Sequence, residues 1–199
     1  MNTSVTAWNN EEICRHILST NFPKLKDSNH FLALKSCFDL AFDCETVLDV
    51  GCCKAELAEA FPNLNYTGAD LKHVVENVSK AIRPSLKYIH FDANSDDYSL
   101  MSNYDIIVMN SFLSEMPNGN EILNKVLKHA KKYVIIHRQD IESKTKTINY
   151  QTYGAMNTVN FIISREDFNR TIKEHNCKII FETQSFPEHP EKRSLIISK

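Results

Sequence analysis

Short apolar runs rich in β-branched residues recur along the chain from residue 46, and each ends at turn-forming residues. This pattern is typical of buried strands. The runs are residues 46–50, 65–70, 86–91, 104–109 and 132–136. Between them lie segments that place their apolar side chains on one helical face, namely residues 54–61, 71–82 and 121–130. Strands that alternate with helices predict right-handed crossovers and a mostly parallel sheet that is covered on both faces.

The C-terminal part adds a helix and a strand pair. Ser164 is a good helix cap, with Asp167 three residues later and Phe168 on the apolar face. Residues 177–183 and 193–198 are the last strands, and the short connection between them predicts an antiparallel hairpin. The expected fold is α/β: a doubly wound, mostly parallel seven-stranded sheet with an antiparallel last strand and helices on both faces.

Two segments lie outside this alternation. Residues 1–45 are predicted to be an N-terminal helical cover on a domain of residues 46–199, and a lid over a ligand site is the alternative. The second segment, from residue 137 to about 163, is polar and reads as irregular. A loop of that length in a compact domain is either ordered by a ligand or partly mobile.

Composition narrows the function. The formal net charge is −2, and no cluster of basic residues forms the cationic face that nucleic-acid binding requires. No signal peptide and no apolar run of the ~20 residues that span a membrane is found, so a cytoplasmic protein without a membrane partner is expected. Six cysteines occur without the spacing of zinc ligands, and no metal is expected. A small-molecule partner fits this composition, whereas the oligomeric state is left open.

Candidate chemistry gathers where the strands end, because ligands of open parallel sheets bind beyond the carboxyl ends of the strands. Gly51 follows the first strand and allows either a close backbone approach to a ligand or a plain tight turn. Asp70 ends the second strand, where it would accept hydrogen bonds from ribose hydroxyls or cap the next helix. Asp92 after the third strand, and Asn110 with Ser111 after the fourth, face a ligand or satisfy local loop backbone.

Taken together, these segments resemble the motifs of the class I S-adenosylmethionine-dependent methyltransferases. Residues 47–51 (VLDVG) resemble the first motif, 66–70 (YTGAD) the second, 91–93 (FDA) the third and 104–117 (YDIIVMNSFLSEMP) the fourth. The antiparallel last strand fits as well, whereas the glycine fingerprint of dinucleotide-dependent dehydrogenases is absent. The resemblance implies a transferase that binds S-adenosylmethionine.

The resemblance also implies a set of cofactor-binding residues: Asp49, Gly51, Cys52, Cys53, Asp70, Leu71, Asp92, Ala93, Asn110 and Ser111. Asp49 and the 51–53 loop would flank the methionine part and Asp70 would hold the ribose. Leu71 would pack on the adenine, Asp92 with Ala93 would bound its edge, and Asn110 with Ser111 would lie near the methyl group. The sequence departs from the family at Cys53 and Ala55, where glycines are usual.

Methyl transfer needs an acid–base residue only when the acceptor must first lose a proton. Candidates at the expected edge are His137 and Glu115, each of which also fits a structural role. Substrate contacts are predicted in the 137–163 segment, at Arg138, Tyr150, Tyr153 and Asn160. Two functions follow: a methyltransferase that acts on a small-molecule or natural-product acceptor, or a catalytically degenerate methyltransferase-like domain that serves as a binding or scaffold module.

Overall fold

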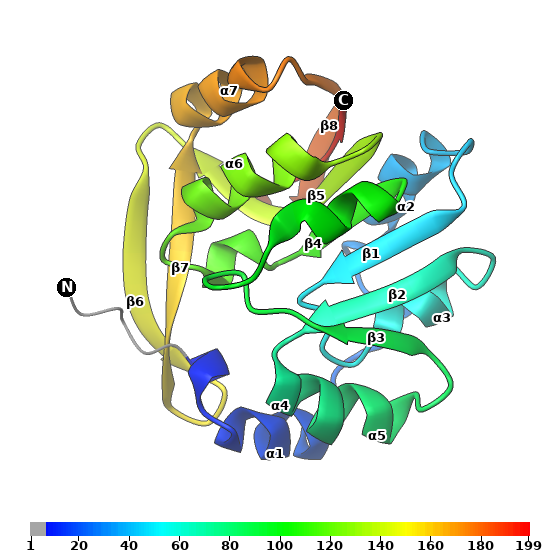
Figure 1. Cartoon of the computed structure of the whole chain (residues 1–199). Helices are drawn as coiled ribbons and strands as arrows, with labels where there is room; N and C mark the ends of the chain where they lie inside the picture. The colour runs from blue at the N-terminus through cyan, green and yellow to red at the C-terminus, as the bar shows by residue number, and fades with distance from the viewer. Residues whose placement is uncertain (1–6) are drawn as a thin grey trace.

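A computed structural model describes residues 7–199. It contains a nine-stranded mixed sheet with helices on both faces (Figure 1). The strands are β1 (Thr46–Val50), β2 (Asn65–Asp70), β3 (Lys87–His90), β4 (Ile106–Asn110), β5 (Tyr133–Glu142), β6 (Lys146–Thr152), β7 (Met156–Ser164), β8 (Lys178–Phe186) and β9 (His189–Ser198). The α-helices are α1 (Glu12–Ser19), α2 (Phe31–Asp39), α3 (Glu56–Ala60), α4 (Lys72–Val74), α5 (Lys80–Ile82), α6 (Gly119–His129) and α7 (Arg165–Glu174).

Short helical turns complete the chain: η1 (Ala7–Asn9), η2 (Leu25–Asp27), the π-helical turn η3 (Val75–Ser79), η4 (Tyr98–Asn103) and η5 (Leu113–Glu115). The predicted helix over residues 71–82 is thus one helical segment, α4–η3–α5, with a π turn at its centre. The predicted cap of α7 is confirmed, because Ser164 Oγ accepts a hydrogen bond of 2.9 Å from the Asp167 amide.

The sheet confirms the expected fold class. Strands β3, β2, β1, β4 and β5 are neighbours in that order and run parallel. The last strand, β9, pairs antiparallel with both β5 and β8. The first strand, β1, lies inside the sheet: β2 and β3 follow on one side of it, and β4 and β5 on the other. The strand order therefore reverses beside β1. That reversal is where ligands of such sheets bind.

The prediction of an irregular segment over residues 137–163 was wrong. Strand β5 continues past its last partner on β4, and the next residues form the antiparallel hairpin β6–β7. The end of β5 then pairs with β7, which raises the number of strands from the expected seven to nine. Almost every residue of β6 is exposed, so its stability comes from backbone pairing and its sequence carries no apolar run. Gly154, with a φ angle of 76°, is the turn signal that was available.

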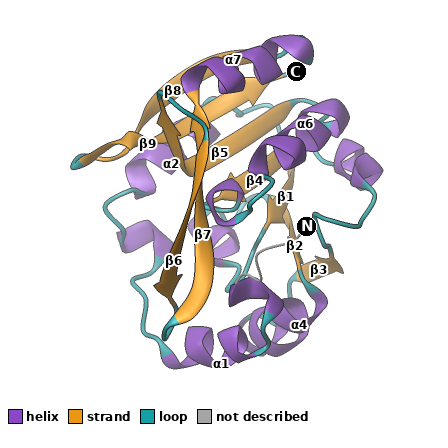
Figure 2. Ribbon diagram, turned by 90° about the vertical axis from the view of Figure 1, so that its left-hand side faces the viewer, coloured by secondary structure: helices purple, strands orange, loops and turns teal. Residues whose placement is uncertain are grey.

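The helices form layers on the two faces of the sheet. Helices α6 and α7 pack with one face through a core that includes Leu48, Met109 and Leu127. Helix α2 lies on the other face, where Leu34 and Phe38 join the core beside β1. Figure 2 shows the β6–β7 hairpin as a long arm that runs from the region of α7 to α1. None of the helices in residues 7–199 is long and apolar enough to cross a bilayer.

Candidate functional site at the carboxyl edge of the sheet

The loop between β1 and α3 keeps a glycine-type backbone although only its first residue is glycine. Gly51, Cys53 and Ala55 have φ angles of 75°, 44° and 53°. This left-handed region costs L-residues roughly 1–2 kcal/mol, and glycine reaches it freely. Cys53 and Ala55 therefore adopt a backbone conformation that glycine favours. The amides of Gly51 and Cys52 both bond to the carbonyl of Ala69 on β2, which holds the loop close to the second strand.

Cys53 is not directed into open space. Its side chain packs against a buried apolar core that α1 and the α4–η3 segment form. Four other partly buried side chains pack against the same core, and with Cys53 we call them the lid cluster: Trp8, Leu71, Tyr153 and Met156. Burial raises the pKa of the Cys53 thiol well above its usual range, so the sulfur remains protonated. All six cysteines are free thiols. The N-terminal turn and the tip of the β6–β7 hairpin thus meet over the end of β1 and β2.

Asp70 lies at the end of β2, directly beside the loop. Its Oδ2 accepts a hydrogen bond of 2.9 Å from the Cys53 amide, and its Oδ1 accepts one of 2.8 Å from the Leu71 amide. The alternative role, a cap for the following helix, is not seen, because α4 has no side-chain cap. Burial raises the pKa of Asp70 to about 6. Each oxygen has a second lone pair, so the fixed carboxylate has capacity for further donors.

The third and fourth strands end in local turns. Asp92 Oδ1 accepts the Asn94 amide at 2.9 Å and its Oδ2 accepts the Ser95 hydroxyl at 3.1 Å, so this carboxylate shapes its own turn. The carbonyl of Ala93 accepts the hydroxyl of Tyr98. Ser111 has a φ angle of 56°, and its amide bonds to the carbonyl of His137 on β5.

Phe112, which sequence analysis missed, covers the first loop. A Cβ built on Gly51 would lie 2.5 Å from Phe112 Cδ2, so the ring and the glycine are in tight contact. A surface cavity of about 300 Å³ occurs elsewhere, near the amino ends of the strands, and is lined by Thr46, Asn65, Thr67, Lys87, Asn103 and Tyr104. At the carboxyl edge, the Phe112 ring therefore lies directly against the backbone of the first loop.

Asp49 lies one layer below this edge. Its carboxylate accepts a hydrogen bond of 2.9 Å from the hydroxyl of Tyr66 within the core that α2 covers. Burial raises the pKa of Asp49 to about 7, and the nearby Asp70 carboxylate acts in the same direction. Its hydrogen bond with Tyr66 joins β1 to β2.

Glu115 is the polar centre beneath the lid. It accepts hydrogen bonds from Trp8 Nε1 at 2.8 Å, the Tyr153 hydroxyl at 2.8 Å and the Thr158 hydroxyl at 3.1 Å. These donors come from η1, the hairpin turn and β7. Glu115 therefore fixes two distant segments over the end of β4. Trp8 is the only tryptophan of the chain, which was the available signal for its role.

His137 is fully buried and engaged on both ring nitrogens. Its Nε2 is 2.9 Å from His30 Nδ1, and its Nδ1 is 2.6 Å from the hydroxyl of Ser194. The Ser194 hydroxyl is 2.7 Å from that of Ser185, which accepts the Arg138 amide at 3.2 Å. Burial lowers the pKa of His137 well below its usual value, with the Arg138 charge as a second cause. This chain of contacts is typical of a structural histidine.

The predicted substrate residues separate into two groups. Arg138 and Tyr153 come together at the edge, where Arg138 Nε donates to Asn110 Oδ1 at 3.0 Å. Tyr150 lies on β6 with 41% of its surface exposed. Asn160, on β7, donates to Asp140 at 2.8 Å and thereby ties the hairpin to β5. Within residues 7–199, no group of three His, Cys, Asp or Glu side chains is arranged to hold a metal ion.

Comparison with solved structures identifies the fold. An amino pentose methyltransferase from Micromonospora echinaspora aligns over 100% of this chain and 98% of its own, with a TM-score of 0.63 and 10% identity. An S-adenosylmethionine-dependent methyltransferase from Mesorhizobium loti gives a TM-score of 0.66 at 9% identity over 88% and 100% of the two chains. The magnesium protoporphyrin IX methyltransferase from Synechocystis gives 0.64 at 12% identity over 94% and 93%. The chain therefore has the class I Rossmann-like methyltransferase fold, as its motifs indicated.

The sequence has no significant match among the curated proteins with which it was compared. A family model, in contrast, matches residues 33–186, from α2 to the end of β8, and is described as methionine biosynthesis protein MetW. The matched region contains strands β1 to β8, together with the loop at Gly51 and the carboxylate of Asp70. The chain belongs to the MetW family.

Proposed function

We propose that this protein is an S-adenosylmethionine-dependent methyltransferase that acts on a small-molecule acceptor. The observation that carries the proposal is the pairing of Asp70 with the left-handed loop, in which the Cys53 amide holds the carboxylate at the end of β2. A loop of this shape brings backbone close to a ligand, and a fixed carboxylate with free lone pairs suits the two hydroxyls of a ribose. Small-molecule acceptors among the similar structures, and the family's description, support the acceptor class.

In this proposal, the cofactor-binding residues keep the roles that the motifs imply. Asp70 binds the ribose hydroxyls, and Leu71 packs on the adenine, whose edge Asp92 and Ala93 bound. The loop at Gly51, Cys52 and Cys53, supported from below by Asp49, contacts the methionine part. Asn110 and Ser111 lie near the methyl group.

When bound, S-adenosylmethionine supplies an activated methyl group for an in-line displacement. The chain's own contribution is to orient the two reactants and to exclude water. The lid cluster, held by Glu115, suits this second task because it covers the ends of β1 and β2. We assign no proton transfer to His137 or Glu115, since hydrogen bonds within the protein engage both ring nitrogens and both carboxylate oxygens.

The first test is titration calorimetry with S-adenosylmethionine and S-adenosylhomocysteine. Micromolar binding is expected, and the absence of heat at millimolar ligand would remove the enzyme hypothesis. An Asp70→Ala variant is expected to bind at least tenfold more weakly, because it loses the acceptors for the ribose hydroxyls. An Asp43→Ala variant, at a surface carboxylate that pairs with Lys132, is the control and is expected to bind as the wild type does.

The same carboxylate predicts a pH dependence. Its pKa of about 6 means that Asp70 is ionised above pH 6 and protonated below it. Affinity for S-adenosylhomocysteine is therefore expected to be highest above pH 7 and to fall as the pH drops through 6. An Asp70→Asn variant would show weak binding without this fall, whereas an identical pH profile in both proteins would contradict the ribose assignment.

A second candidate function is that of a catalytically degenerate domain, which acts as a binding or scaffold module. The packing of the Cys53 side chain and the close contact of Phe112 with Gly51 favour this alternative. Restoring the family glycine tests this alternative. We expect Cys53→Gly to bind S-adenosylhomocysteine about tenfold more tightly than Cys53→Ala, because only glycine relieves the left-handed strain and also removes the Cβ. Calorimetry on both variants measures the difference. A scaffold would bind in neither case.

The division at residue 45 and the cytoplasmic location belong to this proposal as well. Residues 1–45 would act as a cover that is continuous with the core through α2, and residues 46–199 as the methyltransferase domain. Limited proteolysis with and without S-adenosylhomocysteine would test the division, since ligand binding is expected to protect the segment before α2.

A further inference from the structure

Arg138 lies at the carboxyl edge because of an irregularity in β5. The preceding residue, His137, is the last one that pairs with β4, and the register between β5 and β9 shifts between Ile136 and Gln139. Arg138 sits at this shift with a φ angle of 61°, in the left-handed region. Bulges of this kind redirect a side chain and occur next to active sites. The bulge places Arg138 at the same edge as Asn110. The Nε–H of Arg138 donates a hydrogen bond to Asn110 Oδ1.

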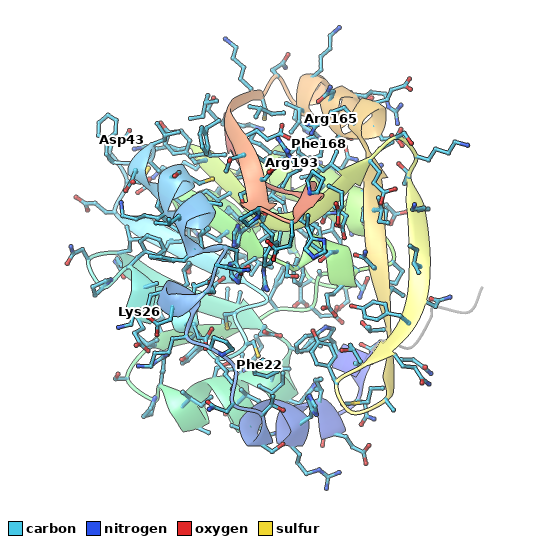
Figure 3. All side chains as sticks on the ribbon, turned by 180° about the vertical axis from the view of Figure 1, so that it is seen from behind. Phe22, Lys26, Asp43, Arg165, Phe168 and Arg193 are labelled. Carbon is cyan, nitrogen blue, oxygen red and sulfur yellow. The ribbon has the colours of Figure 1, made fainter. Side chains whose placement is uncertain are left out.

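In the part of the chain that the structure describes, the guanidinium of Arg138 has no carboxylate partner. The chain has six arginines, and each of the other five forms an ion pair in the described structure: Arg15, Arg83, Arg165, Arg170 and Arg193. Arg165 and Arg193, for example, lie side by side where both contact Glu182 (Figure 3). Within residues 7–199, no carboxylate oxygen lies within 4.0 Å of the guanidinium nitrogens, and of these nitrogens only Nε has a hydrogen bond to a side chain.

This lack of a partner is unusual because Arg138 is only partly exposed to solvent. Burial lowers the pKa of its guanidinium, and the nearby Tyr153, Glu115 and Glu56 act in the opposite direction. Glu115 is close enough to favour the charge, yet the three side-chain hydrogen bonds that it accepts come from Trp8, Tyr153 and Thr158. Removing a cation partly from water without a hydrogen-bonded anion costs free energy, and a bound anion would offset that cost.

We propose that the methyl acceptor carries an oxyanion, either a carboxylate or a phosphate, which binds the two terminal nitrogens of Arg138. The proposal rests on the methyltransferase function proposed for this site and names its substrate class. The planar guanidinium fork matches the two oxygens of either group and forms paired hydrogen bonds with them. Asn110 orients the fork through Nε and leaves both Nη groups available. The acceptor's anion is thus held beside the end of β4, where the methyl group is expected.

The experiment measures binding of simple anions to the full chain by calorimetry at constant ionic strength, with and without S-adenosylhomocysteine. The probes are inorganic phosphate, butyrate and the neutral isostere butyramide. We expect the wild type to bind at least one of the two anions with a millimolar Kd and to bind butyramide at least tenfold more weakly. Preference for phosphate indicates a phosphorylated acceptor, and preference for butyrate indicates a carboxylic acid.

Variants localise the effect. Arg138→Gln is expected to weaken anion binding at least tenfold, and Arg138→Lys by less, because lysine keeps the charge without the planar fork. Arg170→Gln, at an exposed arginine paired with Asp167, is the matched control and should bind as the wild type does. Thermal melting of each variant checks its fold, and the comparison of butyrate with butyramide in the wild type needs no variant.

The outcomes separate this inference from the proposed function. Equal binding of butyrate and butyramide together with no binding of phosphate would overturn the inference, as would full retention of anion binding in Arg138→Gln. If S-adenosylhomocysteine fails to bind while anion binding depends on Arg138, the transferase proposal is lost and the anion site itself stands. If S-adenosylhomocysteine binds and neither anion does, the transferase proposal stands and the anion-binding inference is lost.

Discussion

Replacement of His137 by alanine is expected to lower the free energy of unfolding by about 3–5 kcal/mol. The imidazole is fully buried and connects His30, the residue that precedes α2, with Ser194 on β9. Its removal leaves a cavity and takes the partner of His30 Nδ1 away, whereas the Ser194 hydroxyl keeps only its contact with Ser185. Unsatisfied buried polar groups cost roughly 1–3 kcal/mol each. Urea denaturation of the wild type and the variant measures the difference.

Two other histidines provide controls for this prediction. His30→Ala is expected to destabilise less, because its ring lies at the margin of the core and solvent reaches the vacated space more easily. His90→Ala, at a ring that is 46% exposed and contacts Glu76, should change stability by no more than about 0.5 kcal/mol. Equal losses in His137→Ala and His90→Ala would contradict the structural role of the buried network.

Asp49→Asn is expected to stabilise the protein at high pH by up to about 4 kcal/mol. The folded-state pKa of Asp49 is about 7, mainly because of burial, whereas its ordinary value is 3.8. Between these values the folded protein keeps the proton and the unfolded chain has lost it. Asp49 therefore makes stability decline as the pH rises from about 4 to 7. Asparagine still accepts the hydrogen bond from Tyr66 and does not titrate, so it removes this decline.

The measurement is the free energy of unfolding of both proteins at pH 5 and pH 8. The advantage of the asparagine variant should be small at pH 5 and large at pH 8. Asp70 titrates in the same direction and remains in both proteins, so it cancels in the comparison. A Tyr66→Phe variant is the cross-check: it removes the donor to the ionised form and should steepen the decline. A constant difference between Asp49→Asn and wild type across this range would refute a buried, titrating Asp49.

The regular core of this protein could be read from its sequence because local and global preferences agree there. Residues 46–50 and 65–70 were predicted as strands and form β1 and β2 with those bounds. Both are short apolar runs, buried along most of their length, so the same residues that favour a strand also favour the centre of the sheet. The antiparallel β9 followed from a connection too short for a helix.

The β6–β7 hairpin shows where such reasoning fails. Most of β6 is exposed, so no apolar alternation marks it, and its hydrogen bonds go to β7 across the turn at Gly154. Pairing between backbones leaves little trace in the residue types of an exposed strand. The mistake mattered for the site, because this hairpin carries Tyr153 to the lid cluster and Thr158 to Glu115.

The sequence by itself determined the α/β fold, the order of the central elements and the set of polar residues at the ends of the strands. Only the tertiary structure decided what those residues contact: Asp49 binds Tyr66, His137 binds His30 and Ser194, and Arg138 alone among the arginines has no carboxylate in the described chain. The physical reason is the separation along the chain of the residues that interact. Periodicity along the chain is set by neighbours a few residues apart, whereas these contacts join residues separated by 17 to 107 positions.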